Sequence, residues 1–335
     1  MRIAAILLTL ILFPASLVVG AVGRNAPEFH GRITTGVGLI YRTDGDSYLF
    51  DFPIYGNLGV TYTSGIVESK VSIDYINEPG IGETYVKGGT RYSNLKIGIY
   101  EERWGVGYRS SPVSILNSRE SRYPDNVFYQ CYYRPNPIFS MTVGSERVHG
   151  QFVISGRDGV PSSIYDALLG TRLVGRWEGY DMSLGFVRHA GLPPSLFFLT
   201  AVTEDESSSF WSEIGWETSL YDADLGSMVL GYKRELRAAS VIAEYAIWGA
   251  NSLILVENVF YLREQLDAGA VLYLHFGDFR DAWSTAMNLY LRMGVGKGAL
   301  LEPGIVLFFG KPGTFLGPHE TENDNSMYLR FKFEF

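Results

Sequence analysis

Cysteine is almost absent from this chain of 335 residues, and long apolar runs are missing after residue 23. The single cysteine, Cys131, excludes a disulfide framework within the chain. No later apolar run reaches the ~20 residues that a membrane helix needs. Basic residues are also scarce, with 28 Lys and Arg against 36 Asp and Glu. That acidic balance argues against a nucleic-acid partner, which would require a basic surface.

Histidine is equally sparse, and its five copies do not form a recognisable site. His149 near Ser145 and Glu146 is the nearest approach to a nucleophile and its base, and the spacing is not that of a catalytic triad. No His, Cys or Asp cluster has metal-ligand spacing. Gly36-Val-Gly38 and Gly105-Val-Gly107 lack the strand–turn–helix context of a nucleotide site. We therefore expect no enzymatic activity, no metal and no cofactor.

The chain begins with a segment typical of secretory signal peptides. A positive start at Arg2 precedes an apolar stretch from Ile3 to Val19, and small residues follow up to Ala21-Val22-Gly23. We expect cleavage before Arg24, so that residues 1–23 are a signal peptide and residues 24–335 form a single domain. A retained membrane anchor is the alternative. Loss of Arg2 would leave 27 basic residues against 36 acidic ones.

The last ten residues, S-M-Y-L-R-F-K-F-E-F, alternate strictly in polarity. A strand places neighbouring side chains on opposite faces, so one face of this segment is wholly apolar and the other is mostly charged. The apolar face consists of Met327, Leu329, Phe331, Phe333 and Phe335, and the other face of Tyr328, Arg330, Lys332 and Glu334. A soluble edge strand is the alternative interpretation of this segment.

This pattern over Met327–Phe335, closed by a terminal aromatic, resembles the C-terminal strand of bacterial outer-membrane β-barrels. The resemblance implies an all-β fold: a transmembrane, antiparallel, up-and-down β-barrel in the outer membrane of a bacterial cell. It also implies that Tyr328, Phe331, Phe333 and Phe335 belong to the signal read by the barrel-insertion machinery. The lipid bilayer and that machinery are the expected partners.

The composition agrees with a barrel. The chain contains 22 Tyr, 20 Phe and 38 Gly, and its mean hydropathy is +0.04. In a membrane barrel the apolar residues of the outer face and the polar residues of the lumen together give a mean hydropathy near zero. Aromatic residues near strand ends suit the interfacial girdles of such a barrel; those residues are Tyr41, Tyr100, Trp177, Tyr180, Trp211, Trp216, Tyr261 and Trp283.

Strand-like segments recur along the chain, and a direct count gives about eighteen of them. That count includes a strand at 126–133 and treats 190–209 as a long loop with Pro193-Pro194. It also places the long loops 157–169 and 190–209 on the periplasmic side, where barrels keep short turns. If one segment before residue 157 and one after residue 210 are not strands of the barrel, the long loops move to the extracellular side. We therefore expect about sixteen strands, with fourteen or eighteen as alternatives.

The regular pattern stops after the fifth strand, from Trp104 to Tyr123. The W-G-x-G step at Trp104–Gly107, followed by a proline loop, resembles a segment of porin-like families that leaves the wall and lines the lumen. The resemblance implies that this stretch gathers charged residues at a constriction; the candidates are Arg103, Trp104, Arg109, Arg119, Glu120, Arg122 and Asp125. An extracellular loop with solvated charges is the alternative.

Alternation along the strands predicts which charges face the lumen. The basic candidates are Lys96, Arg172, Arg176, Arg292 and Arg330, and the same face also carries Lys70, Asp74, Glu244 and Lys332. Basic residues outnumber acidic ones in this set although the whole chain is acidic. This suggests a mild preference for anionic or polar solutes; the alternative is that these charges pair with one another and hydrate the lumen.

The sequence thus favours a porin-like channel through which small polar solutes diffuse. One alternative is a transporter of hydrophobic molecules, similar to outer-membrane fatty-acid transporters. Another is a structural barrel without transport. The residues leave the solute and the oligomeric state open, a homo-oligomer included.

The expected signal peptide gives the first prediction. The mature protein, purified from membranes, should begin at Arg24, because Ala21-Val22-Gly23 offers the small residues of a cleavage site. Intact-mass spectrometry with N-terminal sequencing measures this. A mature chain that still carries Met1 would contradict the prediction.

Overall fold

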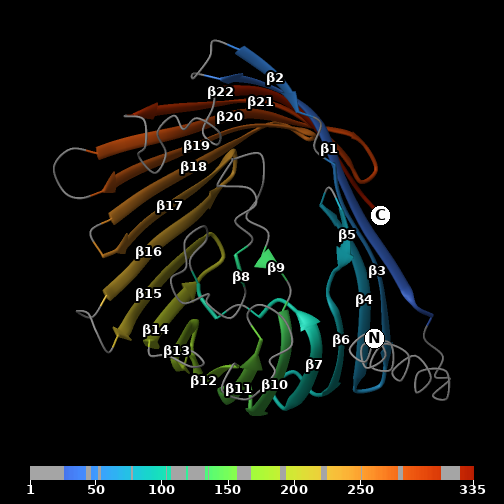
Figure 1. Cartoon of the computed structure of the whole chain (residues 1–335), viewed down its shortest axis with the longest axis vertical. Coiled ribbons are helices and arrows are strands. Elements are labelled where there is room, and N and C mark those ends of the chain that lie inside the picture. The colour runs from blue at the N-terminus through green and yellow to red at the C-terminus, as the bar shows by residue number, and fades with distance from the viewer. Residues whose placement is uncertain are drawn as a thin grey trace.

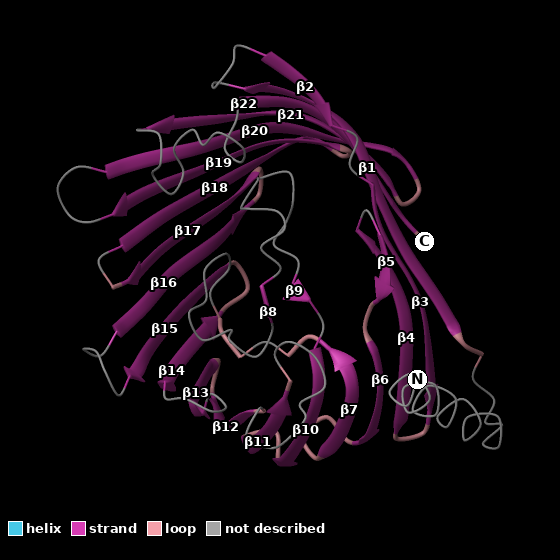
Figure 2. Ribbon diagram, viewed as in Figure 1, coloured by secondary structure: helices cyan, strands magenta, loops and turns pink. Residues whose placement is uncertain are grey.

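A computed structural model provides the structure of this protein. It describes residues 26–42, 47–51, 54–76, 78–102, 104–106, 118–119, 133–134, 136–156, 167–188, 194–219, 225–249, 251–277, 282–310 and 325–335. The expected signal peptide, residues 1–23, lies outside the described residues. Figure 2 shows that the described part is built from strands and loops. No helix in this part is long and apolar enough to cross a membrane.

The strands form one antiparallel ring (Figure 1). Its first half contains β1 (Glu28–Arg42), β2 (Ser47–Asp51), β3 (Ile54–Ser64), β4 (Val67–Ile76), β5 (Glu78–Ile81), β6 (Thr84–Gly89), β7 (Asn94–Tyr100), β10 (Asn136–Gly144), β11 (Val148–Ser155) and β12 (Leu168–Trp177). Its second half contains β13 (Tyr180–Arg188), β14 (Pro194–Glu204), β15 (Ser208–Ser219), β16 (Leu225–Leu236), β17 (Ala239–Trp248), β18 (Asn251–Arg263), β19 (Leu266–Gly277), β20 (Ala282–Gly296), β21 (Ala299–Gly310) and β22 (Asn325–Glu334). A separate pair, β8 (Ser118–Arg119) and β9 (Tyr133–Arg134), is not part of the ring.

The ring has eighteen strand positions. Twenty elements belong to it, but β2 and β3 pair with successive parts of β1 and share one position. In the same way β5 and β6 pair with successive parts of β4. The expected barrel is confirmed. Its strand number is eighteen, the upper end of the expected range, and not the expected value of sixteen.

Two local interpretations explain that difference. The predicted loop at 190–209 is wrong, because Pro194–Glu204 forms β14 between β13 and β15. The predicted strand at 126–133 lies outside the described residues except for Tyr133, which belongs to β9. β7 pairs directly with β10, so the ring has no strand position between these two strands. Omitting a segment before 157 was therefore right, and omitting one after 210 was not.

The ring closes where the two ends of the chain meet. β1 and β22 pair over ten residues, from Arg32↔Glu334 to Tyr41↔Asn325. Beyond this ladder, the backbones of Gly31 and Phe335 exchange two hydrogen bonds of 2.9 and 3.0 Å. A side chain at Gly31 would collide with the Phe335 ring. Closure leaves the β1–β22 seam without an unpaired edge, which a barrel in hydrocarbon requires.

The two rims of the barrel differ. On the rim where β1 begins and β22 ends, each turn between consecutive strands, from the β3–β4 turn to the β20–β21 turn, has only two to four residues. The opposite rim carries the longer connections, including 101–135, 156–167 and 311–324. This is the distribution expected of an outer-membrane barrel, with short turns on the periplasmic side.

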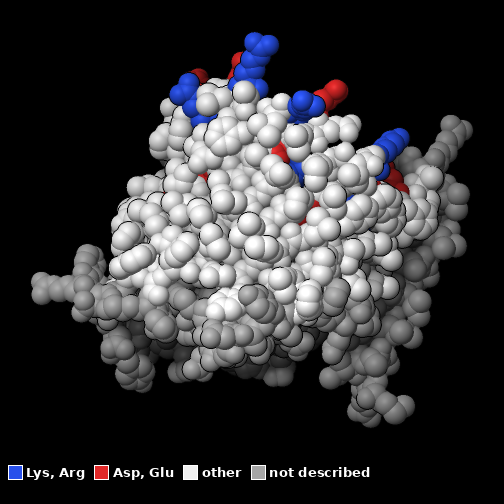
Figure 3. Space-filling model, turned by 90° about the horizontal axis from the view of Figure 1, so that it is seen from above, with Lys and Arg blue, Asp and Glu red and all other residues white. Residues whose placement is uncertain are grey.

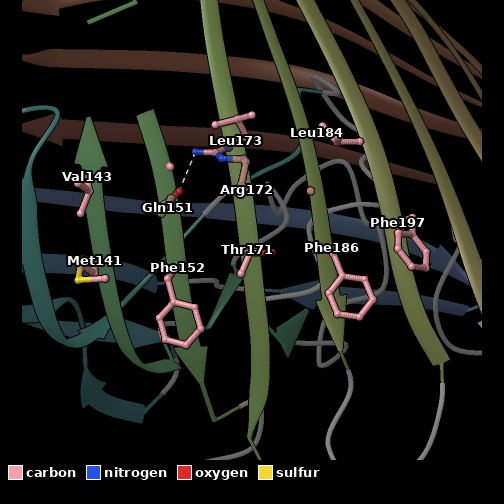
Figure 4. A pocket seen from close by; sticks show the side chains of 12 residues that line it. Met141, Val143, Gln151, Phe152, Thr171, Arg172, Leu173, Leu184, Phe186 and Phe197 are labelled. Atoms are coloured by element: carbon pink, nitrogen blue, oxygen red, sulfur yellow. Dashed lines mark hydrogen bonds between the residues drawn. The ribbon is translucent and has the colours of Figure 1, made fainter. Parts of the chain in front are cut away.

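The outer face of the barrel is apolar. On β22, Met327, Leu329 and Phe331 are exposed, whereas Tyr328 between them is buried, as the alternation predicts. In Figure 3, charged side chains gather along one rim and leave the wall below it almost free of charge. A hollow of about 590 Å³ lies on the outer face of β10–β14. Figure 4 shows side chains that line it, among them Met141, Phe152, Leu173, Leu184, Phe186 and Phe197.

Aromatic residues on the outer face concentrate at the two rims. Five of the predicted girdle residues are exposed there: Trp177, Tyr180, Trp216, Tyr261 and Trp283. Tyr100 and Trp211 are corrections, because both are buried and face the lumen. The Tyr100 hydroxyl donates to Ser140 (2.8 Å), and Trp211 Nε1 donates to Glu244 (3.1 Å). Polar partners on the inner wall explain their inward orientation.

Aromatic rings on the inner face cover glycines of the neighbouring strand. The directly paired examples are Phe198 over Gly185, Trp211 over Gly231, Tyr290 over Gly269 and Tyr328 over Gly304. A Cβ atom at Gly231 would lie 1.9 Å from Trp211 Cε2. These glycines are required because only a residue without a side chain leaves room for the ring.

This packing predicts a difference between two glycines of β16. Gly231→Ala should destabilise the barrel by roughly 1–3 kcal/mol, because the added methyl group forces Trp211 out of place. Gly226→Ala is the matched control: no atom of the described residues lies within 4 Å of its Cβ position, so it should be neutral or slightly stabilising. Urea unfolding in detergent measures both variants. Equal midpoints for the two would show that ring and glycine are not in contact.

Candidate functional site in the lumen

The chain leaves the wall after β7 and follows the inner face of the barrel. The Glu101 backbone N–H donates to Glu83 (3.5 Å), and Glu102 accepts a hydrogen bond from Gln151 of β11 (2.8 Å). The Val106 backbone N–H then donates to Glu213 of β15 (2.9 Å). Glu213 is fully buried, and its neighbours Ile214 and Trp216 alternate with it towards the outside. Residues 101–102 and 104–106 therefore lie on the lumen side of the wall, between β7 and β15.

Trp104 occupies the centre of this segment. Only 1% of its surface is exposed. Its ring lies against Phe198 of β14, with centroids 5.7 Å apart, and over Gly170 of β12, whose Cβ position is 2.6 Å from the indole. Dispersion contacts with these two strands hold the indole inside the barrel. The apolar inner side of β14, with Leu196 and Phe198, thus has an apolar partner.

A hydrogen-bonded chain ties this segment to the wall. Arg172 Nη2 donates to Gln151 (3.0 Å), and Gln151 donates to Glu102. Figure 4 shows the bond between Arg172 and Gln151. The Arg172 guanidinium also lies 5.3 Å from the centroid of the Trp104 ring, within the range of a cation–π interaction. Arg172 therefore supports Trp104 by two routes.

Lys96 lies between two tyrosines on the inner side of β6 and β7. Its Nζ is 3.9 Å from the centroid of Tyr85 and 3.8 Å from that of Tyr100. The two rings meet edge to face, 5.8 Å apart. Nearby, Lys70 forms a 2.5 Å ion pair with Glu83. The positive charges on this side of the lumen are thus held by rings or carboxylates.

A basic cluster surrounds one carboxylate between β20 and β22. Glu302 of β21 is 1% exposed and forms ion pairs with Arg330, with Arg292 (3.3 Å) and with Lys332 (3.7 Å). Three cations share one anion, and the Tyr328 hydroxyl donates to the same carboxylate (3.4 Å). Among the described residues, basic groups therefore outnumber acidic ones in this cluster.

Buried carboxylates lie on the neighbouring part of the wall. Glu213, Glu244 and Glu257 are all less than a tenth exposed and face the lumen from β15, β17 and β18. Tyr290 donates to Glu257 (3.4 Å), as Trp211 does to Glu244. The lumen is therefore divided into an acidic sector and the basic cluster around Glu302.

A cavity of about 670 Å³ lies on the turn side of Trp104. Arg172, Arg176 and His149 line it together with Trp104 and Val106. At its edge Arg176 and Asp181 form a double hydrogen bond of 2.6 Å per contact. The cavity is the candidate passage between the inward segment and the rim of short turns.

The structure places six of the predicted lumen residues: Lys96, Trp104, Arg172, Arg176, Arg292 and Arg330 lie as described above. Arg103, Arg109, Glu120, Arg122 and Asp125 lie outside the described residues. Arg119 belongs to β8, and its side chain is not described. In Figure 1, β8 and β9 appear within the outline of the ring. At the C-terminus Phe333 contacts Phe335, with centroids 5.6 Å apart.

Sequence reasoning did not single out Glu213, Gln151, Phe198 or Glu302. Glu302 precedes Pro303-Gly304, and polar and apolar residues do not alternate regularly around it. The signal that could have found Glu213 is a lone carboxylate within an aromatic strand, between Trp211 and Trp216. Among the described residues, no group of His, Cys, Asp and Glu could hold a metal ion.

Comparisons with known proteins agree on the fold. No family model matches the sequence, and no curated protein matches it. Similar solved structures include Pseudomonas aeruginosa OpdL, with a TM-score of 0.64, 9% identity, and coverage of 92% of this chain and 98% of that one. A Rhodopseudomonas blastica porin variant has a TM-score of 0.55, 11% identity, and coverage of 92% and 100%. An anion-selective porin from Comamonas acidovorans has a TM-score of 0.53, 10% identity, and coverage of 92% and 99%. The chain thus has the fold of a porin-like β-barrel.

The Glu302 cluster predicts a large effect from a small change. Glu302→Gln should lower the free energy of unfolding by about 2 kcal/mol or more, since it leaves three cations close together without their carboxylate. Urea unfolding in detergent measures this.

Glu334→Gln is the control, because its 3.8 Å pair with Arg32 is solvent-exposed and should contribute under ~1 kcal/mol. If both variants unfolded at the same urea concentration as the wild type, the cluster would have no role in stability.

Proposed function

We propose that this protein is a channel of a bacterial outer membrane through which small polar solutes diffuse. The apolar outer face and its aromatic rims suit a bilayer, and the likeness to porins supports the same location. Nothing in the proposal requires a catalytic step. The channel would be inserted by the barrel-insertion machinery, which would read the C-terminal strand up to Phe335.

One observation carries the proposal: the Trp104–Val106 segment lies inside the ring and is anchored to β12, β14 and β15. A segment held there narrows the lumen, and the cavity of about 670 Å³ beside it keeps space for a solute. Charged side chains line this space, which favours hydrated solutes over apolar ones.

Most described lumen charges are already paired. Lys70 pairs with Glu83, Arg176 with Asp181, and the basic cluster with Glu302. Paired charges act weakly on a passing ion at physiological ionic strength. We therefore expect weak selectivity among small inorganic ions, with the basic cluster favouring anions.

A carrier of hydrophobic molecules is the second candidate. An apolar stripe on the inner side of β16–β21, including Val229, Leu255, Val271, Val306 and Phe308, favours it. These side chains are buried, however, so a solute in the lumen does not reach them. The accessible lining carries arginines and carboxylates, and we prefer the polar channel for this reason.

Trp104→Ala tests the narrowing. In planar lipid bilayers the wild type should conduct ions, and the variant should show a larger single-channel conductance, because removing the indole widens the passage. Liposome swelling should likewise admit larger sugars through the variant. Trp216→Ala, which removes an outward-facing indole, is the control and should conduct as the wild type does.

A wild-type protein that conducts no ions would refute the channel. A Trp104→Ala variant with wild-type conductance and the same sugar cut-off would refute the role of this segment.

A further inference from the structure

We infer that the hollow on the outer face of β10–β14 is a binding site for one phospholipid of the leaflet on the side of the short turns. An acyl chain of this lipid would occupy the hollow, and its zwitterionic head group would lie at the rim of short turns. The inference rests on the proposed location in a membrane and concerns the outer face of the wall instead of the lumen.

The hollow exists because two outward positions of the wall carry small side chains or none. In one row of paired residues, Thr171 lies between Phe152 and Phe186 (Figure 4). In the next row towards the short turns, the outward position of β11 is Gly150. Phe186 and Phe197 pack on each other with centroids 4.8 Å apart and close one side. The larger neighbours thus enclose a recess of about 590 Å³.

The lining of the hollow is apolar and open to the outside. Five of its side chains expose between 41% and 59% of their surface: Met141, Val143, Leu173, Leu184 and Phe197. An acyl chain therefore reaches the hollow from the bilayer without a change in the wall. Because lipid chains are as apolar as leucine, such a chain would be held by dispersion contacts with the recess and not by its removal from water.

The hollow lies at the depth of a single leaflet. Thr171 is six residues from Trp177, an exposed aromatic residue at the turn end of β12. Six residues of a strand cover about 20 Å, which at the usual tilt of barrel strands is about 15 Å of depth. Half of the hydrocarbon core of a bilayer measures about 15 Å as well. An acyl chain that begins at the rim therefore ends in the hollow.

An open track connects the hollow with the rim. At Gly150 the nearest atom to an added Cβ would be the Val143 carbonyl oxygen, 4.0 Å away. At Gly175, closer to the rim, no atom of the described residues lies within 4 Å of that position. Trp177 and Tyr180 are exposed where the track ends. Aromatic residues take this place at the level of lipid head groups.

The charges at this rim fit a zwitterionic head group. The turns between β10 and β15 carry one arginine and four carboxylates, all exposed: Glu146, Arg147, Glu178, Asp205 and Glu206. At the adjoining strand ends Arg176 and Asp181 pair with each other, and Glu204 adds a carboxylate. A phosphate group can accept hydrogen bonds from Arg147, and an ammonium group can approach the carboxylates. A head group with only a negative charge would meet an excess of like charge.

Native mass spectrometry of the full mature protein in a neutral detergent tests the site. After removal of bound lipid, dioleoyl phosphatidylethanolamine is added stepwise at a fixed detergent concentration. We expect one lipid molecule to bind before any others. Dioleoyl phosphatidylglycerol, which has the same chains and a negatively charged head group, should bind more weakly.

Two variants fill the hollow from different strands. Gly150→Leu places its side chain in open space, so the barrel should still fold. It should raise the Kd for phosphatidylethanolamine about tenfold, because the leucine takes the place of roughly ten atom contacts between protein and chain. Thr171→Leu should have the same effect from β12.

Gly226→Leu is the matched control. It adds the same side chain to a glycine of β16 that pairs with the outward-facing Trp216 and lies outside the hollow. No atom of the described residues lies within 4 Å of its Cβ position. This variant should bind phosphatidylethanolamine with the wild-type Kd.

The outcomes are distinct. A wild-type Kd in both Gly150→Leu and Thr171→Leu, or an equal loss in Gly226→Leu, would overturn the site. Binding of phosphatidylglycerol as tight as that of phosphatidylethanolamine would overturn the match to a zwitterionic head group. A lipid-free dimer that separates into monomers in Gly150→Leu would assign the hollow to a second copy of this chain.

Ion conduction in planar bilayers is measured on the same preparations. A barrel that binds the lipid but conducts no ions would overturn the channel and leave the lipid site in place. A conducting barrel without the expected lipid binding would overturn the lipid site alone.

Discussion

Closure of the sheet is the constraint on which the rest of this structure depends. A strand edge in hydrocarbon would leave a row of N–H and C=O groups without partners, at several kcal/mol for each group. Here the first and last strands pair along ten residues, and Gly31 and Phe335 continue the seam with two backbone hydrogen bonds. Phe335 therefore takes part in the closure. Because the closed ring has one outer and one inner face, alternate side chains of every strand must point to the outside or to the lumen.

Closure also determines what the inner wall must do. Eighteen strand positions enclose a lumen that side chains of the wall only partly fill. In the described part, aromatic rings cover glycines of the next strand, which tightens the wall. The Trp104–Val106 segment adds a second inner layer between β7 and β15. The proposed narrowing and the cavity beside Trp104 are both consequences of this layer.

Strands in which polar and apolar residues alternate strictly could be predicted from the sequence, whereas a strand with two apolar faces could not. The C-terminal strand was predictable because Met327, Leu329 and Phe331 alternate with Arg330 and Lys332, and the structure turns the two sets to opposite sides. β14 was missed because Leu196 and Phe198 face inward against Trp104 while Phe197 and Leu199 face outward. The contact with Trp104 that makes an apolar inner face favourable involves a residue some ninety positions away in the chain, and no local pattern contains it. The inward direction of the W-G-x-G segment was suggested by resemblance, whereas its anchor on Glu213 could only come from the structure.

The central claim is that alternate side chains of the wall face lipid and a wet lumen. Spin labels attached to single cysteines, in a Cys131→Ser background, test it by their accessibility to oxygen and to a water-soluble nickel chelate. At Leu329 and Ile305 the label should collide with oxygen and be shielded from nickel, and at the inward-facing positions Asn288 and Arg330 the preference should reverse. The same preference at both sets of positions would contradict the account.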